Sequence, residues 1–431
     1  MNMTKFSAGF ARLDTTPHLG VPIGGYFEPR FTKGVLDPLS VNALAFGDGE
    51  KSAVLLVADL CSLGNTANNW SKEIAQAADI APESVILCCT HTHTSPALGK
   101  NETYDAFLLQ RLKDAAIIAL NDRKPVEDLR WIEGHAEGLT YVRRWKLSDG
   151  TVMTNPPASV REMIVAPACD CDDTLRVIRI LRQDAPEIIL GNFQAHPDNI
   201  GGEFISADFP GAFRARVEEL CKNTHCIFTN GCEGQMVTMD RRKPNTPASH
   251  EKATTHGKAL AELAVSMLHR CVSTEMTGLS FGHQAVDLKT KRDPSRVPES
   301  QRIIELYTAG RWEEYTTTKK QANYMYSEAR KIVTLEELQQ DYRPTAVSAI
   351  AFCGLAFVGI PGEPFNEVGI QIRGNSKFPV TCALCNANGS HGYFPTALAH
   401  EQGGYESYNT PYVKGTAELL ADTADALLAS L

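Results

Sequence analysis

The chain has 431 residues, of which 43% are apolar and 22% are charged, and its net charge is −9. This composition is ordinary for a soluble globular protein and excludes a disordered, collagen-like or coiled-coil chain. The acidic balance argues against nucleic acid as a partner, because proteins that bind a phosphate backbone carry a basic face.

The N-terminal segment MNMTKFSAGFARLDTTP lacks the apolar region of a secretory signal. No run of roughly 18 or more apolar residues follows, so no membrane span is expected. We therefore expect a cytoplasmic protein whose twelve cysteines are reduced. Cys382 and Cys385 form a CxxC pair, but a zinc ribbon would need a second pair, so these cysteines are interpreted as small hydrophobic residues.

Strand-like and helix-like segments alternate along the chain. Continuous apolar runs bounded by turn residues predict strands buried on both faces. These runs are 53–59, 84–90, 175–181, 188–196, 225–230, 347–352, 355–360 and 380–385. Amphipathic stretches predict helices at 68–77, 104–120, 211–222, 254–268, 366–374 and 416–431. The order indicates an α/β fold with mixed β-sheets and flanking helices, in one large domain over residues 1–431.

Residues 292–341 differ in composition, being rich in Glu, Lys, Arg, Gln and Tyr with few long apolar runs. They predict a polar helical excursion, a helix pair lying over the main body. Such an excursion serves as a lid, as a contact in a homo-oligomer, or only as a solvated insertion. The sequence leaves these three readings open.

Four predicted strands lead into a polar side chain that can hold a metal or act in catalysis. One strand ends in His91-Thr92-His93, a second reaches His196, a third leads to Glu363 and a fourth to Tyr393. In α/β sheets, ligand-binding groups collect beyond the carboxyl ends of the strands. Residues two apart in an extended segment point to the same side, so both imidazoles of the HxH motif can face one site. Two His and one carboxylate can bind Zn²⁺ and leave coordination positions open for water and substrate. The sequence therefore predicts a metal site at the C-terminal ends of these strands.

Short blocks spread along nearly the whole chain carry a resemblance to a known family. In chain order they are DTTP (14–17), GGY (24–26), DPL (37–39), VADL (57–60), THTHTSP (90–96), AHP (195–197), SADFPG (206–211), PGEP (361–364), GY (392–393) and GYE (404–406). They resemble the motifs of the neutral/alkaline, non-lysosomal ceramidases. The similarity is to the N-terminal catalytic domain and to short bacterial proteins built from that domain alone.

The resemblance implies a zinc-dependent amide hydrolase that holds one Zn²⁺ per chain. It assigns four metal ligands: His91, His196, Glu363 and Tyr393. It further implies that His93 orients or deprotonates the attacking water and that Tyr405 donates a hydrogen bond to the developing oxyanion.

Three departures from the family pattern bear on the substrate. The loop NGCEGQMVT (230–238) has Gln235 where the family has Asp, and Val237 where it has a Ser important for activity. A signal peptide and the C-terminal immunoglobulin-like domain of the exported ceramidases are not expected here, so ceramide is the less favoured substrate. Arg143 matches an Arg of the family motif. It either hydrogen-bonds to an oxygen of a small polar or anionic substrate, or pairs with an acid on the surface. Arg143 and Gln235 are therefore the candidate substrate-binding residues.

Other residues have two readings each. Asp59 is interpreted either as a carboxylate that orients a metal-bound His or as an N-cap. Asp208 either orients a ligand or caps a helix. The acidic run 170–173 indicates a turn rather than a second metal site. The Gly24–Gly25 pair permits close backbone approach at the border of the pocket.

The leading functional hypothesis is a zinc-dependent hydrolase of a C–N amide, or a related carbonyl bond, in a small polar substrate. One alternative is a metal-assisted lyase or isomerase acting on a sugar-derived compound, which the missing Ser at position 237 would favour. Another is a binding protein that keeps the fold without the chemistry. Nucleotide-binding motifs and the GxSxG nucleophile elbow are absent from the sequence.

Overall fold

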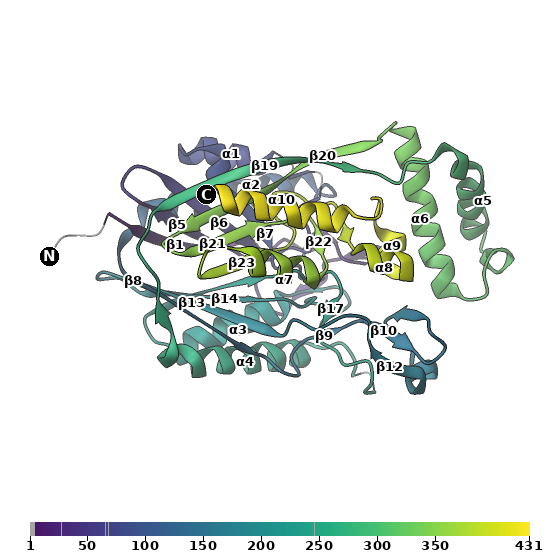
Figure 1. Cartoon of the computed structure of the whole chain (residues 1–431), viewed down its shortest axis with the longest axis horizontal. Helices are drawn as coiled ribbons and strands as arrows, with labels where there is room; N and C mark the ends of the chain where they lie inside the picture. Colours follow the sequence, from purple (N-terminus) through teal and green to yellow (C-terminus); the bar gives the residue numbers. More distant parts are fainter. Residues whose placement is uncertain (1–4, 27, 65, 68, 245) are drawn as a thin grey trace.

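Two β-sheets face each other, and helices cover their outer faces (Figure 1). The computed structural model describes residues 5–431 apart from 27, 65, 68 and 245. The start of the expected N-terminal segment (residues 1–4) and Asn68, the first residue of one predicted helix, lie outside the described residues. The α/β fold with mixed sheets predicted from the sequence is confirmed.

The larger sheet has nine strands and is mostly antiparallel. Eight of them follow the order β16 (Thr224–Asn230), β14 (Glu187–Phe193), β13 (Thr174–Arg182), β8 (Lys124–His135), β1 (Ser7–Asp14), β5 (Ser40–Gly47), β6 (Ser52–Ala58) and β7 (Val85–Cys89), and β18 (Val272–Ser273) pairs with β8. Only the two terminal pairs of this order, β16–β14 and β6–β7, are parallel. This assembly is called the large sheet below.

The small sheet has four strands in the order β19 (Leu279–Lys289), β20 (Tyr342–Phe352), β21 (Leu355–Gly359) and β23 (Val380–Leu384). Its last pair, β21–β23, is parallel. The remaining short strands are β2 (Pro22–Ile23), β3 (Arg30–Phe31), β4 (Gly34–Val35), β9 (Tyr141–Val142), β10 (Arg144–Leu147), β11 (Val152–Thr154), β12 (Ile164–Pro167), β15 (Phe204–Ile205), β17 (Met236–Val237), β22 (Glu363–Pro364) and β24 (Tyr393–Phe394).

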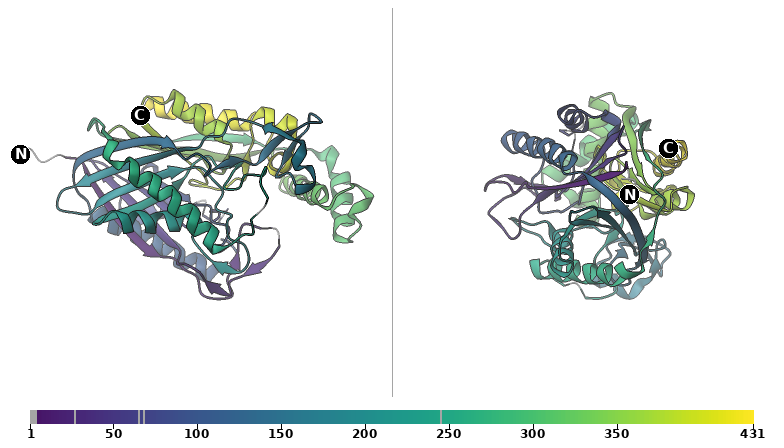
Figure 2. Two further views of the ribbon diagram at one scale, coloured as in Figure 1. Left: turned by 90° about the horizontal axis from the view of Figure 1, so that it is seen from below. Right: turned by 90° about the vertical axis from the view of Figure 1, so that its left-hand side faces the viewer.

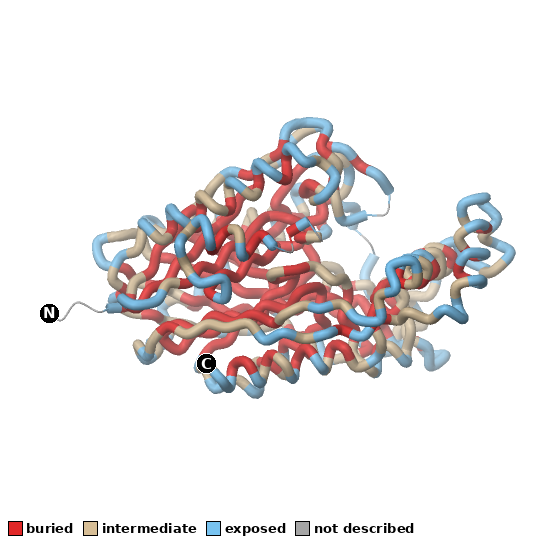
Figure 3. Tube along the Cα trace, turned by 90° about the horizontal axis from the view of Figure 1, so that it is seen from above, coloured by how far each residue is buried: buried red, intermediate tan, exposed pale blue. Residues whose placement is uncertain are grey.

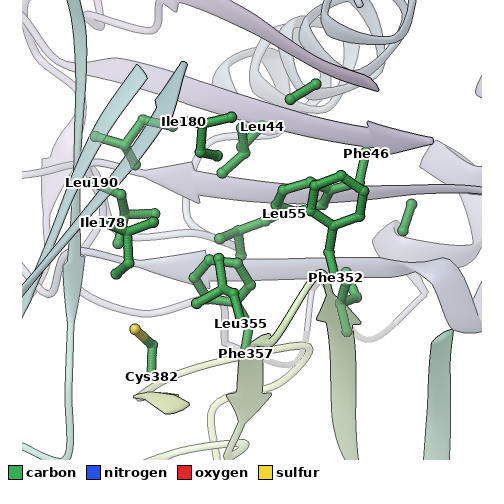
Figure 4. Packing of buried hydrophobic residues seen from close by; sticks show 14 of the residues in the cluster. Leu44, Phe46, Leu55, Ile178, Ile180, Leu190, Phe352, Leu355, Phe357 and Cys382 are labelled. Carbon is green, nitrogen blue, oxygen red and sulfur yellow. The ribbon is translucent and has the colours of Figure 1, made fainter. Parts of the chain in front are cut away.

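The central core lies between the two sheets and contains Leu55, Ile178 and Leu190 of the large sheet with Phe352 and Phe357 of the small sheet (Figure 4). Side chains alternate between the faces of a strand. Alternate residues of the same strands therefore reach a second core on the outer face of the large sheet. This explains why strands such as β6 and β7 are apolar along almost their whole length: both of their faces are covered.

Helices form the two outer layers (Figure 2). On the large sheet, α1 (Trp70–Ala78) and α2 (Glu102–Asn121) cover β1 and β5–β7, while α3 (Asp208–Leu220) and α4 (His250–Met267) cover β13, β14 and β16. On the small sheet lie α7 (Asn366–Asn375) and α10 (Thr416–Ser430). Helices α3 and α4 approach so closely that a Cβ at Gly257 would lie 2.5 Å from the Phe209 carbonyl oxygen.

The polar segment 292–341 forms a helical hairpin, α5 (Val297–Thr308) and α6 (Lys319–Glu337), inserted between β19 and β20. It stands at the end of the molecule away from the N-terminus, and its surface is largely exposed (Figures 1 and 3). Its helix α6 packs against α9 (Tyr405–Asn409), next to α8 (Ala397–Gln402). The predicted helix pair is confirmed. One of its helices contacts the element that carries Tyr405.

All eight predicted strands and six predicted helices are present, with ends shifted by a few residues. The main omissions are β1, β5, β8 and β19, of which β8 and β19 alternate apolar with polar or charged residues. Single 3-10 turns occur at η1 (Pro82–Ser84), η2 (Ala158–Met163), η3 (Leu268–Arg270), η4 (Pro294–Arg296) and η5 (Trp312–Glu314). Within the described residues, no helix is both long and apolar enough to cross a membrane.

Candidate metal and active site

The large sheet curls so that its two terminal parallel strands, β7 and β16, approach each other, and the buried Asn230 side chain joins their ends. Its amide nitrogen donates to the carbonyl oxygens of Thr90 and Ala195, at 3.0 Å each. Its amide oxygen accepts from the Ala195 N–H at 3.2 Å. Thr90 directly precedes His91 and Ala195 directly precedes His196, so this one side chain brings the two predicted His ligands together.

His91, His196 and Glu363 form a buried group whose candidate ligand atoms all lie within 4.8 Å of one another. The Glu363 Oε2 atom is 3.5 Å from the Nε2 atoms of both His91 and His196. The three residues follow β7, β14 and β21, so the structure brings together the ends of three strands as the sequence predicted.

Backbone carbonyls orient both imidazoles. The His91 Nδ1 atom is 2.6 Å from the Cys61 carbonyl oxygen, and the His196 Nδ1 atom is 2.9 Å from the carbonyl oxygen of Glu233 and 3.0 Å from that of Met236. A carbonyl at these distances requires a proton on Nδ1, which leaves Nε2 with its lone pair directed toward Glu363. Metal-binding His residues are commonly held in this way. His91 also has a left-handed backbone, with φ of 72°, a conformation that non-glycine residues rarely adopt outside constrained sites.

The Glu363 carboxylate fits a metal ion. Its Oε2 atom is buried and has no hydrogen-bond partner among the described residues. Burial opposes its ionisation, but His91, His196 and Arg143 more than offset this and lower the pKa of Glu363 to about 2. A buried carboxylate oxygen without a donor is costly, and a cation between it and the two Nε2 atoms would remove that cost. Cys61 also lies near His91 and His93, but burial raises its pKa, so the neutral thiol is a poor ligand.

Backbone pairing places Tyr393 beside Glu363. The short strands β22 and β24 are parallel, and Glu363 and Tyr393 are register partners. The Tyr393 ring stacks on the His196 ring, with centroids 6.4 Å apart and planes at 15°. Burial and the nearby Glu363 raise the pKa of the Tyr393 hydroxyl well above its usual value. Its placement agrees with a fourth ligand position, which the sequence implied only through the family resemblance.

His93 lies beside the candidate metal group, with its Nε2 atom 3.3 Å from the Nε2 atom of His91. Burial and the neighbouring His91 and His196 hold the pKa of His93 well below its usual value, so its imidazole is neutral. The Nδ1 atom is 3.9 Å from a carboxylate oxygen of Asp198. The backbone of Gly25 packs on the imidazole: φ is +95°, and a Cβ there would lie 2.9 Å from the ring. Gly25 of the glycine pair therefore lies directly against the His93 ring.

Tyr26 and Arg30 complete the surroundings of His93, and sequence reasoning assigned neither of them a role. The Tyr26 hydroxyl donates to Asp198, the Arg30 guanidinium carbon lies 4.0 Å from the Tyr26 ring centroid, and Arg30 Nη2 donates to the His93 carbonyl oxygen at 2.8 Å. Tyr26 lies in the GGY block, which was the only sequence signal for this group.

Arg143 faces the site. Its Nη1 atom is 3.4 Å from His196 Nε2, and its guanidinium carbon lies 5.2 Å from the Tyr393 ring centroid. One reading of the sequence paired Arg143 with an acid on the surface. The structure shows a buried partner instead: Arg143 Nε donates to the fully buried Glu406 at 2.7 Å. Glu406 also accepts from Arg144 Nη1 at 3.2 Å and from the Thr154 hydroxyl at 2.8 Å. This buried carboxylate therefore joins α9 to β10 and β11, and sequence reasoning missed it.

Tyr405, the first residue of α9, lies between Tyr393 and the helical hairpin. Its ring centroid is 5.5 Å from that of Tyr393 and 5.3 Å from that of Tyr324 on α6. The planes of the Tyr393 and Tyr405 rings meet at 67°. Burial raises the pKa of Tyr405 to about 12, so the hydroxyl keeps its proton and can act as a donor.

The Gln235 side chain is engaged elsewhere. Its amide nitrogen donates to Asn366 Oδ1 at 2.6 Å and to Glu367 Oε2 at 2.5 Å, and its amide oxygen accepts from the Asn366 N–H at 3.0 Å. These contacts bind it to the first turn of α7. Within the described part of the chain, no hydrogen bond joins this side chain to His91, His196 or Glu363. Val237 pairs with Tyr141 in the β17–β9 pair and bridges to His196.

Both readings of Asp59 are wrong. Among the described residues it hydrogen-bonds to no imidazole and caps no helix; instead it accepts a two-pronged hydrogen bond from Arg214, at 2.9 and 2.7 Å, and one from the Thr90 hydroxyl at 3.2 Å. Asp208 is the first residue of α3 and accepts from Asn199 and Ile200, so it fixes the loop after His196.

The acidic run 170–173 directly precedes β13, as predicted, but it forms an irregular segment and not a turn. Its members Asp172 and Asp173 are paired with Arg373 and His135. Both cysteines of the CxxC pair are free and buried, as are most of the other ten.

No family model and no curated protein matches the sequence. Two solved structures share the fold. One is a crystal structure of neutral ceramidase from Pseudomonas aeruginosa, with a TM-score of 0.75 and 15% identity over 100% of this chain and 75% of that one. The other is a ceramidase complexed with C2, with a TM-score of 0.74 and 15% identity over 100% of this chain and 76% of that one. The likeness confirms, at the level of the fold, the resemblance seen in the sequence blocks.

Proposed function

We propose that this chain is a zinc-dependent hydrolase of the neutral ceramidase type that cleaves a C–N amide bond in a small polar substrate. The observation that carries the proposal is the buried, unpartnered Oε2 atom of Glu363, 3.5 Å from the Nε2 atoms of both His91 and His196. His91, His196, Glu363 and Tyr393 would hold one Zn²⁺. When bound, the ion supplies Lewis acidity: it lowers the pKa of a water to about 7 and polarises a carbonyl oxygen.

His93 is the general base in this proposal. Because its imidazole is neutral and its Nε2 atom lies 3.3 Å from His91 Nε2, it stands beside the metal position with a lone pair available. It can accept the proton that water loses on attacking the carbonyl carbon, and can return this proton to the leaving nitrogen. Asp198, at 3.9 Å from Nδ1, stabilises the imidazolium that forms between the two steps.

Tyr405 supplies the oxyanion contact. Its protonated hydroxyl lies next to Tyr393, and donation to the developing oxyanion by one such group is worth about 3 kcal/mol. Arg143 holds this side of the site in place: its guanidinium carbon lies 5.2 Å from the Tyr393 ring centroid, and its partner Glu406 follows Tyr405 in α9. Arg143 therefore couples the position of the proposed ligand Tyr393 to that of the donor Tyr405.

Hydrolysis is tested directly with the zinc-loaded protein in ¹⁸O-labelled water. A panel of N-acyl amines and N-acyl amino acids is incubated with the protein, and the products are analysed by mass spectrometry. The proposal predicts one ¹⁸O atom in the carboxylic acid product and none in the amine. Unlabelled products would indicate a lyase or isomerase, and a zinc-loaded protein that turns over no amide would indicate a binding protein; both results contradict the proposal.

A further inference from the structure

A cavity of about 540 Å³ lies between helix α6 of the helical hairpin and the loop that precedes β24. Its charged and polar wall includes Arg330, Lys331, Arg343, His391, Ser327 and Asn409. No Asp or Glu lines it among the described residues. The chain as a whole has a net charge of −9. A cavity whose charged side chains are all basic is therefore a local exception to this acidic balance.

The cations of this wall lack acidic partners. Lys331 Nζ donates to the Ser327 hydroxyl at 2.8 Å and to Asn409 Oδ1 at 3.2 Å, and Arg343 Nε donates to Gln340 Oε1 at 3.1 Å. Arg330 lies near the Tyr326 ring, 5.9 Å from its centroid. Among the described residues, no carboxylate lies within 4.0 Å of any of these three cations.

Other arginines of the same hairpin are paired. Arg292 bonds to Glu336 and Asp341, Arg296 to Glu328, Arg302 to Glu299 and Arg311 to Glu314. The acid nearest in sequence to the cavity cations, Glu328, is already engaged by Arg296 at 3.0 Å and Lys291 at 3.7 Å. Among the described residues, Arg330 is the hairpin arginine without an acidic partner, and it lines the cavity.

Burial makes this arrangement costly for the protein alone. It lowers the pKa of Lys331 to about 8, and nearby Lys291 acts in the same direction. Burying a cation without a counter-charge is unfavourable, so an anion in the cavity would offset a cost that the free protein bears. Guanidinium groups bind carboxylate and phosphate oxygens through two parallel hydrogen bonds, and the wall offers two such groups.

The cavity adjoins the proposed catalytic residues on two sides. Its wall residue Gly392 immediately precedes Tyr393. Its wall residue Asn409 lies one helical turn from Tyr405 on α9, and Asn409 Nδ2 donates to the Tyr405 carbonyl oxygen at 2.9 Å. The cavity therefore adjoins the backbone of both Tyr393 and Tyr405.

We propose that the cavity lined by Arg330, Lys331 and Arg343 binds an oxyanion, a carboxylate or phosphate, at the end of the substrate away from the scissile bond. The inference rests on the proposed amide hydrolysis, because it names the substrate class of that site: amides with an anionic group. It also gives the hairpin a role, since α6 supplies two of the three cations and β20, which follows the hairpin, supplies the third.

Binding is tested first without turnover. Inorganic phosphate is titrated into the zinc-loaded, full-length protein at pH 7 by isothermal calorimetry, for the wild type and the double variant Lys331→Met/Arg343→Met. Arg302→Met is the matched control, because Arg302 is a hairpin arginine outside the cavity. We expect the double variant to lose at least about tenfold in phosphate affinity and the control to bind as the wild type does. Equal affinity in all three proteins would overturn the proposal.

A second variant covers the case in which the double variant does not fold. Arg330 is exposed and its side chain donates no hydrogen bond to another described residue, so Arg330→Met should leave the fold intact and still weaken phosphate binding. Unchanged phosphate affinity in a folded Arg330→Met protein would count against the proposal in the same way as the first comparison.

The source of the oxyanion is tested with paired substrates, an N-acyl amino acid and its neutral carboxamide. If the cavity serves the substrate, Lys331→Met/Arg343→Met raises KM about tenfold or more for the acid and leaves KM for the carboxamide unchanged, while phosphate competes only with the acid. Phosphate binding that is lost in the variant without any selective change in KM would assign the cavity to a free anion and overturn the substrate claim. If no amide is hydrolysed, the phosphate titration still decides whether the cavity binds an anion, so failure of the proposed function is recognised separately.

Discussion

Glu363 and Tyr393 are register partners in the parallel pair β22–β24, and the Glu363 N–H donates to the Gly392 carbonyl oxygen at 2.9 Å. The two candidate ligands that follow the small sheet are thus fixed to each other through the backbone. His91 and His196, which follow the large sheet, are fixed by Asn230. The metal position lies where these two pairs meet.

Replacing Tyr393 by Phe tests the fourth ligand position. The substitution keeps the ring that stacks on His196 and removes only the hydroxyl. We expect zinc affinity, measured by competition with a chromogenic chelator, to fall about tenfold or more, with the melting temperature little changed. Tyr408→Phe, on the same helix as Tyr405 and outside the proposed ligand set, should bind zinc normally. Equal zinc affinity in the two variants would remove Tyr393 from the ligand set.

Replacing Gly25 by Ala tests the position of the proposed base. A Cβ at this residue would lie 2.9 Å from the His93 ring on a backbone with φ of +95°, so the imidazole must move. We predict a fall in kcat of about 100-fold, the scale of a lost general base, with full zinc content. Gly20→Ala is the matched control: its φ is +84°, and a Cβ there meets nothing within 4 Å. If both variants lose activity equally, backbone strain rather than His93 is responsible.

Glu406 should be essential for stability. Truncation to Ala leaves the guanidinium groups of Arg143 and Arg144 without their buried acid, which costs about 3–5 kcal/mol of unfolding free energy. Urea denaturation of Glu406→Ala measures this cost. Glu401→Ala, which removes an exposed pair with Lys414, should cost about 1 kcal/mol or less. Similar losses in the two variants would contradict the assigned role of Glu406.

His256 should make stability depend on pH. It lies on α4 against Phe209, with ring centroids 5.0 Å apart, and burial lowers its pKa from 6.5 to about 4. Between these values the unfolded chain binds more protons, so stability is full above about pH 6.5 and decreases as the pH falls toward 4. The loss in unfolding free energy between pH 7.5 and pH 5 should be smaller in His256→Phe by about 1–2 kcal/mol. An identical loss in both proteins would show that His256 does not titrate in this way.

Most of the buried strands could be predicted because both faces of each sheet are covered, which leaves continuous apolar runs; β5, which is buried along its whole length, was missed. The same rule misses β8 and β19, because these strands carry polar residues on partly exposed faces. The hairpin 292–341 was recognised from its composition. Its contact with Tyr405 was not, because α6 and α9 become neighbours only in the folded chain.

The ends of the strands identified His91, His196 and Glu363 as metal-binding candidates, while Tyr393 and Tyr405 came from the family resemblance. Asn230 and Glu406 could not be found in either way. The partner of Asn230 at Thr90 is 140 residues away, and the partner of Glu406 at Arg143 is 263 residues away. Their sequence surroundings give no signal of a role, because each acts by joining segments that only the tertiary fold brings together.

The central claim is that His91, His196 and Glu363 hold a metal ion. The most direct measurement is the metal content of the purified wild type and of His196→Ala by inductively coupled plasma mass spectrometry, with His135→Ala, an exposed His paired with Asp173, as the control. We predict about one zinc per chain in the wild type and the control, and close to none in His196→Ala. Full zinc occupancy in His196→Ala, or no metal in a folded wild type purified with zinc present, would contradict the account.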